Sequence, residues 1–292
     1  MSLLSLFATV VFASETVISP LQFDGSINPL VQTKPSVSFG QLPAPTIPRP
    51  EVLGARAEES SPSVTPSPRS SKKKNYTIAI LGDSMADTLG PDLPNLKEAL
   101  HAYYPTTALA MLNYGFGGTN IDYGLARITH SYSYLGNEIP SLVSQHPDIV
   151  IVESFGYNPY SYDEGALDRH WLQLAAIVDI IKKELPNANI VIAATIAPNA
   201  KTFGDGALNV SFDPIGKAHK VKTIKSYLEN TVRFAESQRL PLADAFHPSL
   251  DGGGNGKKEF INQGDHIHYS DEGRKFFSQK ITETIIANKL LE

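Results

Sequence analysis

The sequence predicts an α/β fold in which a parallel sheet is covered by helices on both faces. Short apolar runs rich in β-branched residues alternate along the chain with longer segments whose apolar residues recur at helical spacing. Strands that alternate with helices form right-handed βαβ units, and such units build parallel sheets. Glycines and small polar residues follow several of the runs, at the edge where open α/β sheets bind their ligands.

Five segments have the composition of buried strands. They are residues 77–81, 108–113, 148–155, 189–195 and 240–245. Helical spacing of apolar residues predicts helices at 96–104, 121–128, 139–145, 167–185, 217–238 and 271–289. In the last helix, Phe277, Ile281 and Ile285 would face the core. We therefore expect residues 75–292 to form a three-layer α/β/α domain around a flavodoxin-like, five-stranded parallel sheet.

Composition excludes several classes of site. The chain of 292 residues has a net charge of −5 and contains no cysteine. Disulfides, thiolate metal sites and cysteine nucleophiles are therefore excluded. Because basic residues are not in excess, nucleic acid is not an expected partner.

The N-terminal quarter differs in composition from the rest. Residues 1–14 contain an apolar run at 3–13, which is shorter than the roughly 20 residues of a membrane-spanning helix. The run has the length of a signal-peptide core, although no lysine or arginine precedes it. Residues 15–74 are rich in proline and serine, which predicts a disordered linker. We expect an exported protein, extracellular or at the cell surface, whose first segment is a signal or a membrane tether.

The first predicted strand ends in Gly82, Asp83 and Ser84. A serine at the carboxyl end of a buried strand can expose its hydroxyl and direct its backbone N–H into the site, as a nucleophile requires. The same residues also suit a simpler role, in which Asp83 or Ser84 only caps the following helix.

The remaining parts of a serine hydrolase site lie after other strands. In the loop before the last helix, His268 could accept the proton of Ser84, and Asp265 could orient the imidazole. An oxyanion hole needs donors already aimed at the reacting oxygen. The candidates are the backbone N–H of Ser84, a backbone N–H at Gly118 and the side-chain amide of Asn158.

These four blocks resemble the SGNH or GDSL hydrolases over residues 75–290. The first block is similar to the family's nucleophile block, with Met85 where leucine is common. In the second and third blocks, Gly118 and Asn158 match the oxyanion residues, and the last block is Asp265-x-x-His268. The resemblance implies a serine esterase that forms an acyl-enzyme and needs neither a metal nor a cofactor.

One position departs from that pattern. The family often has aspartate after the block-three asparagine, whereas this chain has Pro159. Proline has no backbone N–H to donate. We therefore expect a different local shape of the acyl pocket, with the role of Asn158 unchanged.

Aromatic residues on the expected site loops are candidates for substrate binding. They are Phe116, Tyr157 and Tyr160, accompanied by Tyr114 and Tyr162. Such rings could stack on sugar rings, or they could simply form the wall of the pocket without contacting a sugar. Together with predicted export, they favour an enzyme that removes acetyl groups from a polysaccharide or glycan. We also expect the protein to be a monomer. A lysophospholipase or short-chain lipid esterase, an acyltransferase and a non-catalytic glycan-binding domain are the alternatives.

Two further histidines have competing interpretations. His266 could join Asp265 and His268 in a metal site, although no third well-placed ligand is evident. His247, after the fifth predicted strand, could point into the crevice or could be an ordinary loop histidine.

Overall fold

The computed structural model describes residues 67–292. The predicted apolar segment and most of the predicted linker lie outside these residues. The last part of that linker, 67–74, contacts the domain, because the N–H of Arg69 donates to Tyr103 O and the N–H of Lys72 donates to Leu291 O, each at 2.7 Å. Within the described range, no helix has both the length and the apolar character needed to cross a bilayer.

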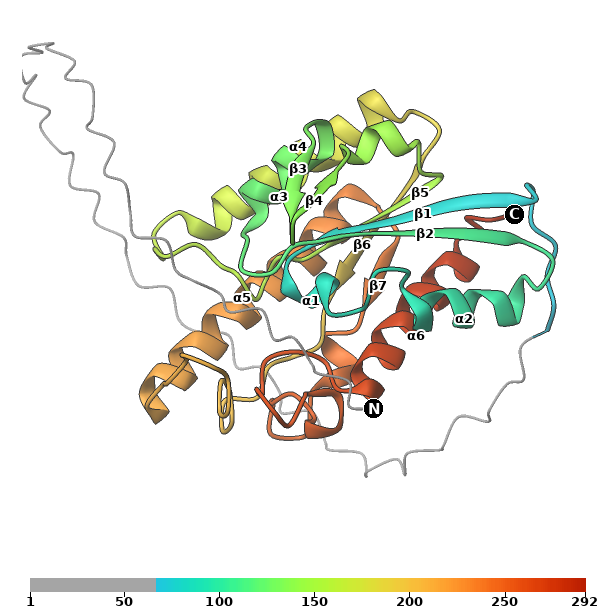
Figure 1. Ribbon diagram of the computed structural model, residues 1–292. Helices are drawn as coiled ribbons and strands as arrows, with labels where there is room; N and C mark the ends of the chain where they lie inside the picture. Colours follow the sequence, from blue (N-terminus) through green and yellow to red (C-terminus); the bar gives the residue numbers. More distant parts are fainter. Residues whose placement is uncertain (1–66) are drawn as a thin grey trace, which may run out of the picture. The chain divides into compact units, whose positions relative to one another are not determined.

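A five-stranded parallel sheet forms the centre of the domain, as predicted (Figure 1). Its order is β2-β1-β5-β6-β7, the flavodoxin-like arrangement. The strands are β1 (Asn75–Gly82), β2 (Ala108–Gly115), β5 (Ile149–Glu153), β6 (Asn189–Ala194) and β7 (Leu242–Asp244). Because all strands run in the same direction, the loops after β1, β2 and β5 meet at one edge.

Six α-helices surround this sheet within residues 67–292 (Figure 1). They are α1 (Ser84–Asp87), α2 (Pro94–Tyr103), α3 (Ile121–Thr129), α4 (Ala166–Glu184), α5 (Pro214–Gln238) and α6 (Asp271–Ala287). Helices α2 and α6 pack together on one face, and α3, α4 and α5 cover the other. Phe277, Ile281 and Ile285 of α6 are fully buried, as expected from their spacing.

The side chains of β1 show how the two faces are filled. Ile78 and Ile80 belong to the core beneath α2 and α6, whereas Ala79 and Leu81 belong to the core beneath α3 and α4. This alternation follows from the two-residue period of a strand. All four side chains are fully buried, which explains why the strand appears in the sequence as a continuous apolar run.

The helix predicted at residues 139–145 is wrong in its first part. Ile139 ends a short antiparallel hairpin, β3 (Tyr132–Tyr134) and β4 (Asn137–Ile139), and only Leu142–Gln145 forms a helical turn, of 3₁₀ type. Pro140 disfavours helical backbone at the residue before it. Leu135 and Gly136 form the hairpin loop with φ values of 50° and 78°, as two-residue turns of this kind require.

Candidate active site

The loop after β1 presents Ser84 at the start of α1. Asp83 is the N-cap of this helix, because its Oδ1 accepts a hydrogen bond from Met85 N at 2.8 Å. Asp83 therefore caps helix α1, and the Ser84 side chain is not needed for capping. Ser84 is half-buried, whereas Asp83 is completely buried.

Glycines allow the neighbouring loops to pack closely against this turn. Gly82 and Gly115 lie side by side at the ends of β1 and β2. A Cβ atom on Gly115 would lie 2.1 Å from the backbone nitrogen of Asp87, so no larger residue fits there. Farther along the same loop, a Cβ atom on Gly117 would lie 4.0 Å from the Cβ of Ser84. The glycine-rich segment therefore runs directly beside the candidate nucleophile.

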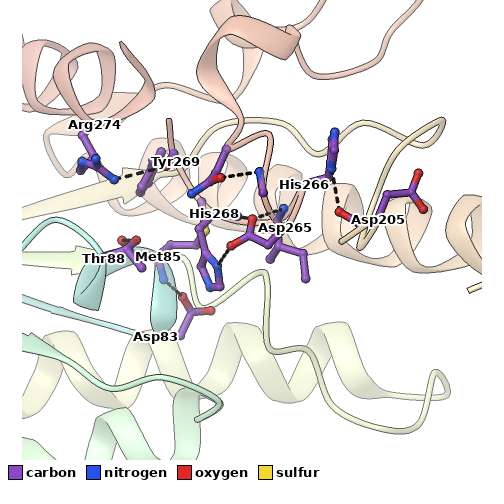
Figure 2. Close-up of polar contacts among 12 residues, drawn as sticks. Asp83, Met85, Thr88, Asp205, Asp265, His266, His268, Tyr269 and Arg274 are labelled. Carbon is purple, nitrogen blue, oxygen red and sulfur yellow. Dashed lines mark hydrogen bonds and ion pairs between the residues drawn. The ribbon is translucent and has the colours of Figure 1, made fainter. Parts of the chain in front are cut away.

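Asp265 and His268 form an acid–histidine pair in the loop before α6 (Figure 2). Asp265 Oδ2 accepts a hydrogen bond from His268 Nδ1 at 2.8 Å, and its Oδ1 accepts from the N–H groups of Ile267 and His268 at 2.9 and 3.0 Å. Burial favours a higher pKa for Asp265, but these hydrogen bonds outweigh it and hold the pKa below its usual value. The carboxylate therefore fixes the imidazole orientation and occupies Nδ1, so Nε2 is the ring nitrogen that remains for a second partner.

The histidine of this pair faces the turn that carries Ser84. Figure 2 shows the His268 ring directed toward the segment of Asp83 and Met85. Burial raises the pKa values of Asp83 and Asp87, and both carboxyl groups are close enough to His268 that a positive charge on its imidazole would oppose these shifts. Within residues 67–292, no hydrogen bond joins the Ser84 hydroxyl to His268. Catalytic hydrogen bonds are often long before substrate binds, so this contact stays a prediction for the substrate-bound enzyme.

Gly118 and Asn158 line the same cavity, which has a volume of about 440 Å³. Gly118 is exposed with a φ of 73°, and Asn158 is half-buried in the loop after β5. Pro159 also lines this cavity, at the position where the family pattern has aspartate. The two candidate oxyanion residues are thus brought together from different strands, as the order of the motifs predicts.

A buried histidine, His170, anchors the segment that leads from β5 to Asn158. His170 Nε2 donates to Ser154 O at 2.8 Å, and Asn230 Nδ2 donates to His170 Nδ1 at 3.1 Å. Burial lowers the pKa of His170 to about 4. A neutral imidazole is required here, because one nitrogen donates and the other accepts.

Replacing Asn158 with alanine is expected to lower kcat for ester hydrolysis by about 10²- to 10³-fold, because one donor to the reacting oxygen is lost. The change in KM should be small, since the interaction strengthens only in the transition state. Steady-state kinetics on an acetyl ester would check this. An equal loss in the binding of a non-reactive substrate analogue would instead assign Asn158 to ground-state binding.

A second buried carboxyl group, which was not predicted from the sequence, lies directly beneath the nucleophile turn. Glu153, the last residue of β5, is completely buried. Its Oε2 accepts from Asp83 N at 3.1 Å, and its Oε1 accepts from Ser154 Oγ and Phe155 N at 2.6 and 3.0 Å. The available signal was an acidic residue at the end of a strand that is otherwise apolar.

Asp83 and Glu153 are too close for both to ionise readily. Burial and the neighbouring charge of Asp83 raise the pKa of Glu153 well above its usual value. Asp83 Oδ2 is buried and has no donor in the described part of the chain. Protonation of Glu153 is therefore favoured, because it removes one of the two negative charges from this buried pair.

The unpredicted hairpin forms an aromatic wall beside the site. The Tyr134 hydroxyl donates to Asp87 Oδ2 at 2.6 Å, and the Tyr134 ring lies 4.0 Å from that of Phe116, centroid to centroid. The guanidinium of Arg127 lies 5.4 Å from the Phe116 ring and donates to Gly82 O at 2.8 Å. Phe116 therefore belongs to a fixed cluster next to the nucleophile turn.

The other aromatic candidates are more buried than expected. Tyr114 is a core residue, contrary to its expected place facing the crevice, and its hydroxyl donates to Pro140 O at 3.0 Å. Tyr157 and Tyr160 line the cavity of Asn158, but their hydroxyls donate to Ile196 O and Asp122 Oδ1. Tyr162 is 43% exposed and stacks on Tyr160.

His266 and His247 have structural partners. His266 Nδ1 lies 2.7 Å from Asp205 O, so its ring points away from His268 (Figure 2). Across residues 67–292, no three side chains of His, Asp or Glu are arranged to hold a metal ion.

Asp244 and His247 repeat the hydrogen-bond pattern of Asp265 and His268. Asp244 Oδ2 accepts from His247 Nδ1 at 2.7 Å, but His247 Nε2 also bonds Glu229 Oε2 at 3.2 Å. Burial lowers the pKa of His247, yet the two carboxylates outweigh it and raise the pKa above its usual value. With both nitrogens occupied, His247 lacks the free nitrogen that a general base needs.

Comparisons with known proteins agree with this architecture. A lipase/acylhydrolase from Enterococcus faecalis has a TM-score of 0.51 at 17% identity, covering 73% of this chain and 96% of its own. A catalytic mutant of an acetylxylan esterase from Geobacillus stearothermophilus has a TM-score of 0.50 at 16% identity, covering 75% and 96%. At these identities the likeness shows a shared fold. A search of curated proteins found no match.

The sequence model of the GDSL-like lipase/acylhydrolase family matches residues 80–276. The match covers the segments that carry Ser84, Gly118, Asn158, Asp265 and His268. The structure brings all of these to the carboxyl edge of the sheet. The chain therefore belongs to the GDSL-like lipase/acylhydrolase family and is a hydrolase.

Proposed function

We propose that this hydrolase is a serine esterase that removes acetyl groups from a polysaccharide or glycan. The observation that carries the proposal is the Asp265–His268 pair, whose imidazole ring faces the segment of Asp83 and Met85 on either side of Ser84. A base that is oriented by a carboxylate and directed at a serine is the arrangement that activates a hydroxyl nucleophile.

In the proposed reaction, Ser84 Oγ attacks the ester carbonyl and His268 Nε2 takes the hydroxyl proton. The carbonyl oxygen becomes an oxyanion, which accepts hydrogen bonds from the N–H groups of Ser84 and Gly118 and from the Asn158 amide. When the intermediate collapses, the sugar oxygen leaves with the proton from His268. Water then attacks the acyl-enzyme with the same base, and acetate is released as Ser84 regains its proton.

The preference for an acetyl ester is supported by the walls of the neighbouring cavity. They include Asn120, Asp122, Ser161, Arg169 and Lys220, together with tyrosine rings. Such walls suit a sugar better than an acyl chain, which would favour an apolar channel. Export predicted from the apolar segment at 3–13, and the acetylxylan esterase among the solved structures of the same fold, point in the same direction.

The direct test compares acetylated oligosaccharides with long-chain acyl esters as substrates. We expect acetate release from the oligosaccharides and labelling of Ser84 by a fluorophosphonate, located by mass spectrometry. Faster hydrolysis of long-chain esters would favour a lipid esterase. Binding of glycans without hydrolysis of any ester or labelling of Ser84 would favour a non-catalytic domain.

A further inference from the structure

The cavity beside Asn158 has a charged wall that the reaction itself does not use. Three elements contribute charged side chains to it: Asp122 from α3, Arg169 from α4 and Lys220 from α5. Gly118 and Asn158 lie on the wall of the same cavity. A single bound molecule can therefore reach the proposed oxyanion hole and these charges together.

Two of the three charges neutralise each other. Arg169 donates to Asp122 Oδ2 at 2.6 Å, and the Tyr160 hydroxyl donates to Asp122 Oδ1 at 2.7 Å. The guanidinium of Arg169 also lies 5.0 Å from the Tyr160 ring centroid. The carboxylate of Asp122 is thus engaged on both of its oxygens and is not available to Lys220.

Lys220 has no such partner among residues 67–292. No ion pair or side-chain hydrogen bond involves it, whereas its neighbours Lys217 and His219 pair with Asp205 and Asp163. Lys220 is half-buried, and burial lowers its pKa with no carboxylate raising it again. A cation held partly out of water without a counter-charge favours binding of an anion.

Exposed aromatic rings accompany this cation. Tyr123 and Tyr162, which also line the cavity, are 62% and 43% exposed. Tyr162 is held by stacking on Tyr160, with ring centroids 5.3 Å apart. Exposed rings in the same cavity as a cation fit a ligand that has both a sugar ring and a negative charge.

We propose that the cavity binds an anionic sugar, so that the substrate is an acetylated glycan whose carboxylate pairs with Lys220. This inference rests on the proposed function, because it identifies the substrate class of the same site. The carboxylate belongs to a uronic acid residue of the glycan, close to the sugar that bears the acetyl group.

The test uses two acetylated oligouronides that differ only in charge. One has free carboxylates, and in the other these groups are converted to primary amides. Since a hydrogen bond to a charged group contributes more than a neutral one, we expect kcat/KM for acetate release to be about 10-fold or more higher with the free carboxylates. The ratio should fall as salt concentration rises, because salt screens the ion pair at this open site.

In the Lys220→Met variant, the kcat/KM for the substrate with free carboxylates should be nearly equal to that for the amidated substrate, so that their ratio is close to one. Lys222→Met is the matched control, because Lys222 is exposed on the same helix and lines a different cavity. The control should keep the wild-type ratio. Equal rates for the two substrates with the wild type, or an unchanged ratio in Lys220→Met, would overturn the anionic-substrate inference and leave the esterase proposal intact.

A binding measurement distinguishes failure of the anionic-substrate inference from failure of the esterase proposal. Calorimetry with the full-length Ser84→Ala protein and a deacetylated oligouronide should show binding that weakens about 10-fold on adding Lys220→Met. If neither acetylated substrate is hydrolysed but this binding difference is present, the proposed esterase activity fails and the anion site stands. Absence of any binding difference overturns the site.

Discussion

Replacing Ser84 with alanine is expected to lower kcat/KM for acetyl esters by about 10³- to 10⁶-fold, because the nucleophile of the proposed acyl-enzyme is removed. Activity that remains would come from the oxyanion donors and from substrate binding. The fold should be retained, since the Ser84 hydroxyl has no hydrogen bond to lose in the described part of the chain. We expect a change of less than about 0.5 kcal/mol in the free energy of unfolding.

The matched control is Ser144→Ala, an exposed serine in the turn after the hairpin. It should keep wild-type kinetics. Steady-state assays and denaturant unfolding of both variants would provide the comparison. Ser84→Ala protein that folds normally and still hydrolyses acetyl esters at the wild-type rate would exclude Ser84 as the nucleophile.

Replacing Glu153 with glutamine is expected to destabilise the protein by about 1–3 kcal/mol at mildly acidic pH. In the native protein, the two Glu153 oxygens accept from Asp83 N and Phe155 N. A glutamine amide has only one oxygen. Either orientation therefore places an NH₂ group against a backbone N–H, and one buried donor loses its acceptor.

The pH dependence of stability should also change. Because the folded-state pKa of Glu153 is raised, the folded protein binds more protons than the unfolded chain from about pH 4.5, the ordinary value, upward. Its contribution to stability is thus complete below that pH and is lost as pH rises toward the folded-state pKa. The slope contributed by one such group is at most about 1.4 kcal/mol per pH unit.

Glutamine does not titrate, so the stability difference between the two proteins should shrink as pH rises. Asp83 is buried in both, so its own titration largely cancels in that difference. Urea unfolding of both proteins between pH 5 and 9 would measure the effect; parallel stability curves for the two proteins would show that Glu153 is already ionised in the folded state.

Most of the secondary structure was predictable because it depends on local patterns. The apolar run of β1 and the helical spacing of Phe277, Ile281 and Ile285 record burial directly in the sequence. The hairpin was not predictable in the same way. Its strands have three residues each, too short for a periodic signal, and Gly136 was the main local indication of its turn.

The acid–histidine pair was predictable only in part, because its local pattern occurs twice in the sequence. Asp265-x-x-His268 and Asp244-x-x-His247 fold into the same local hydrogen-bond pattern, so the three-residue spacing alone does not identify the base. The distinction comes from distant residues. Glu229, on α5, occupies the second nitrogen of His247, while the second nitrogen of His268 stays available near the nucleophile turn.

The sequence by itself determined the parallel α/β architecture, the segments that reach its carboxyl edge and the residue types of the candidate site. These follow from apolar periodicity and from short motifs, which act within a few residues of the chain. Only the tertiary structure decided that Glu153 lies buried next to Asp83, that Tyr134 lies beside the site and that Lys220 faces a cavity with no counter-charge among residues 67–292. Each of these depends on burial and on neighbours far away in the chain, which no local pattern specifies.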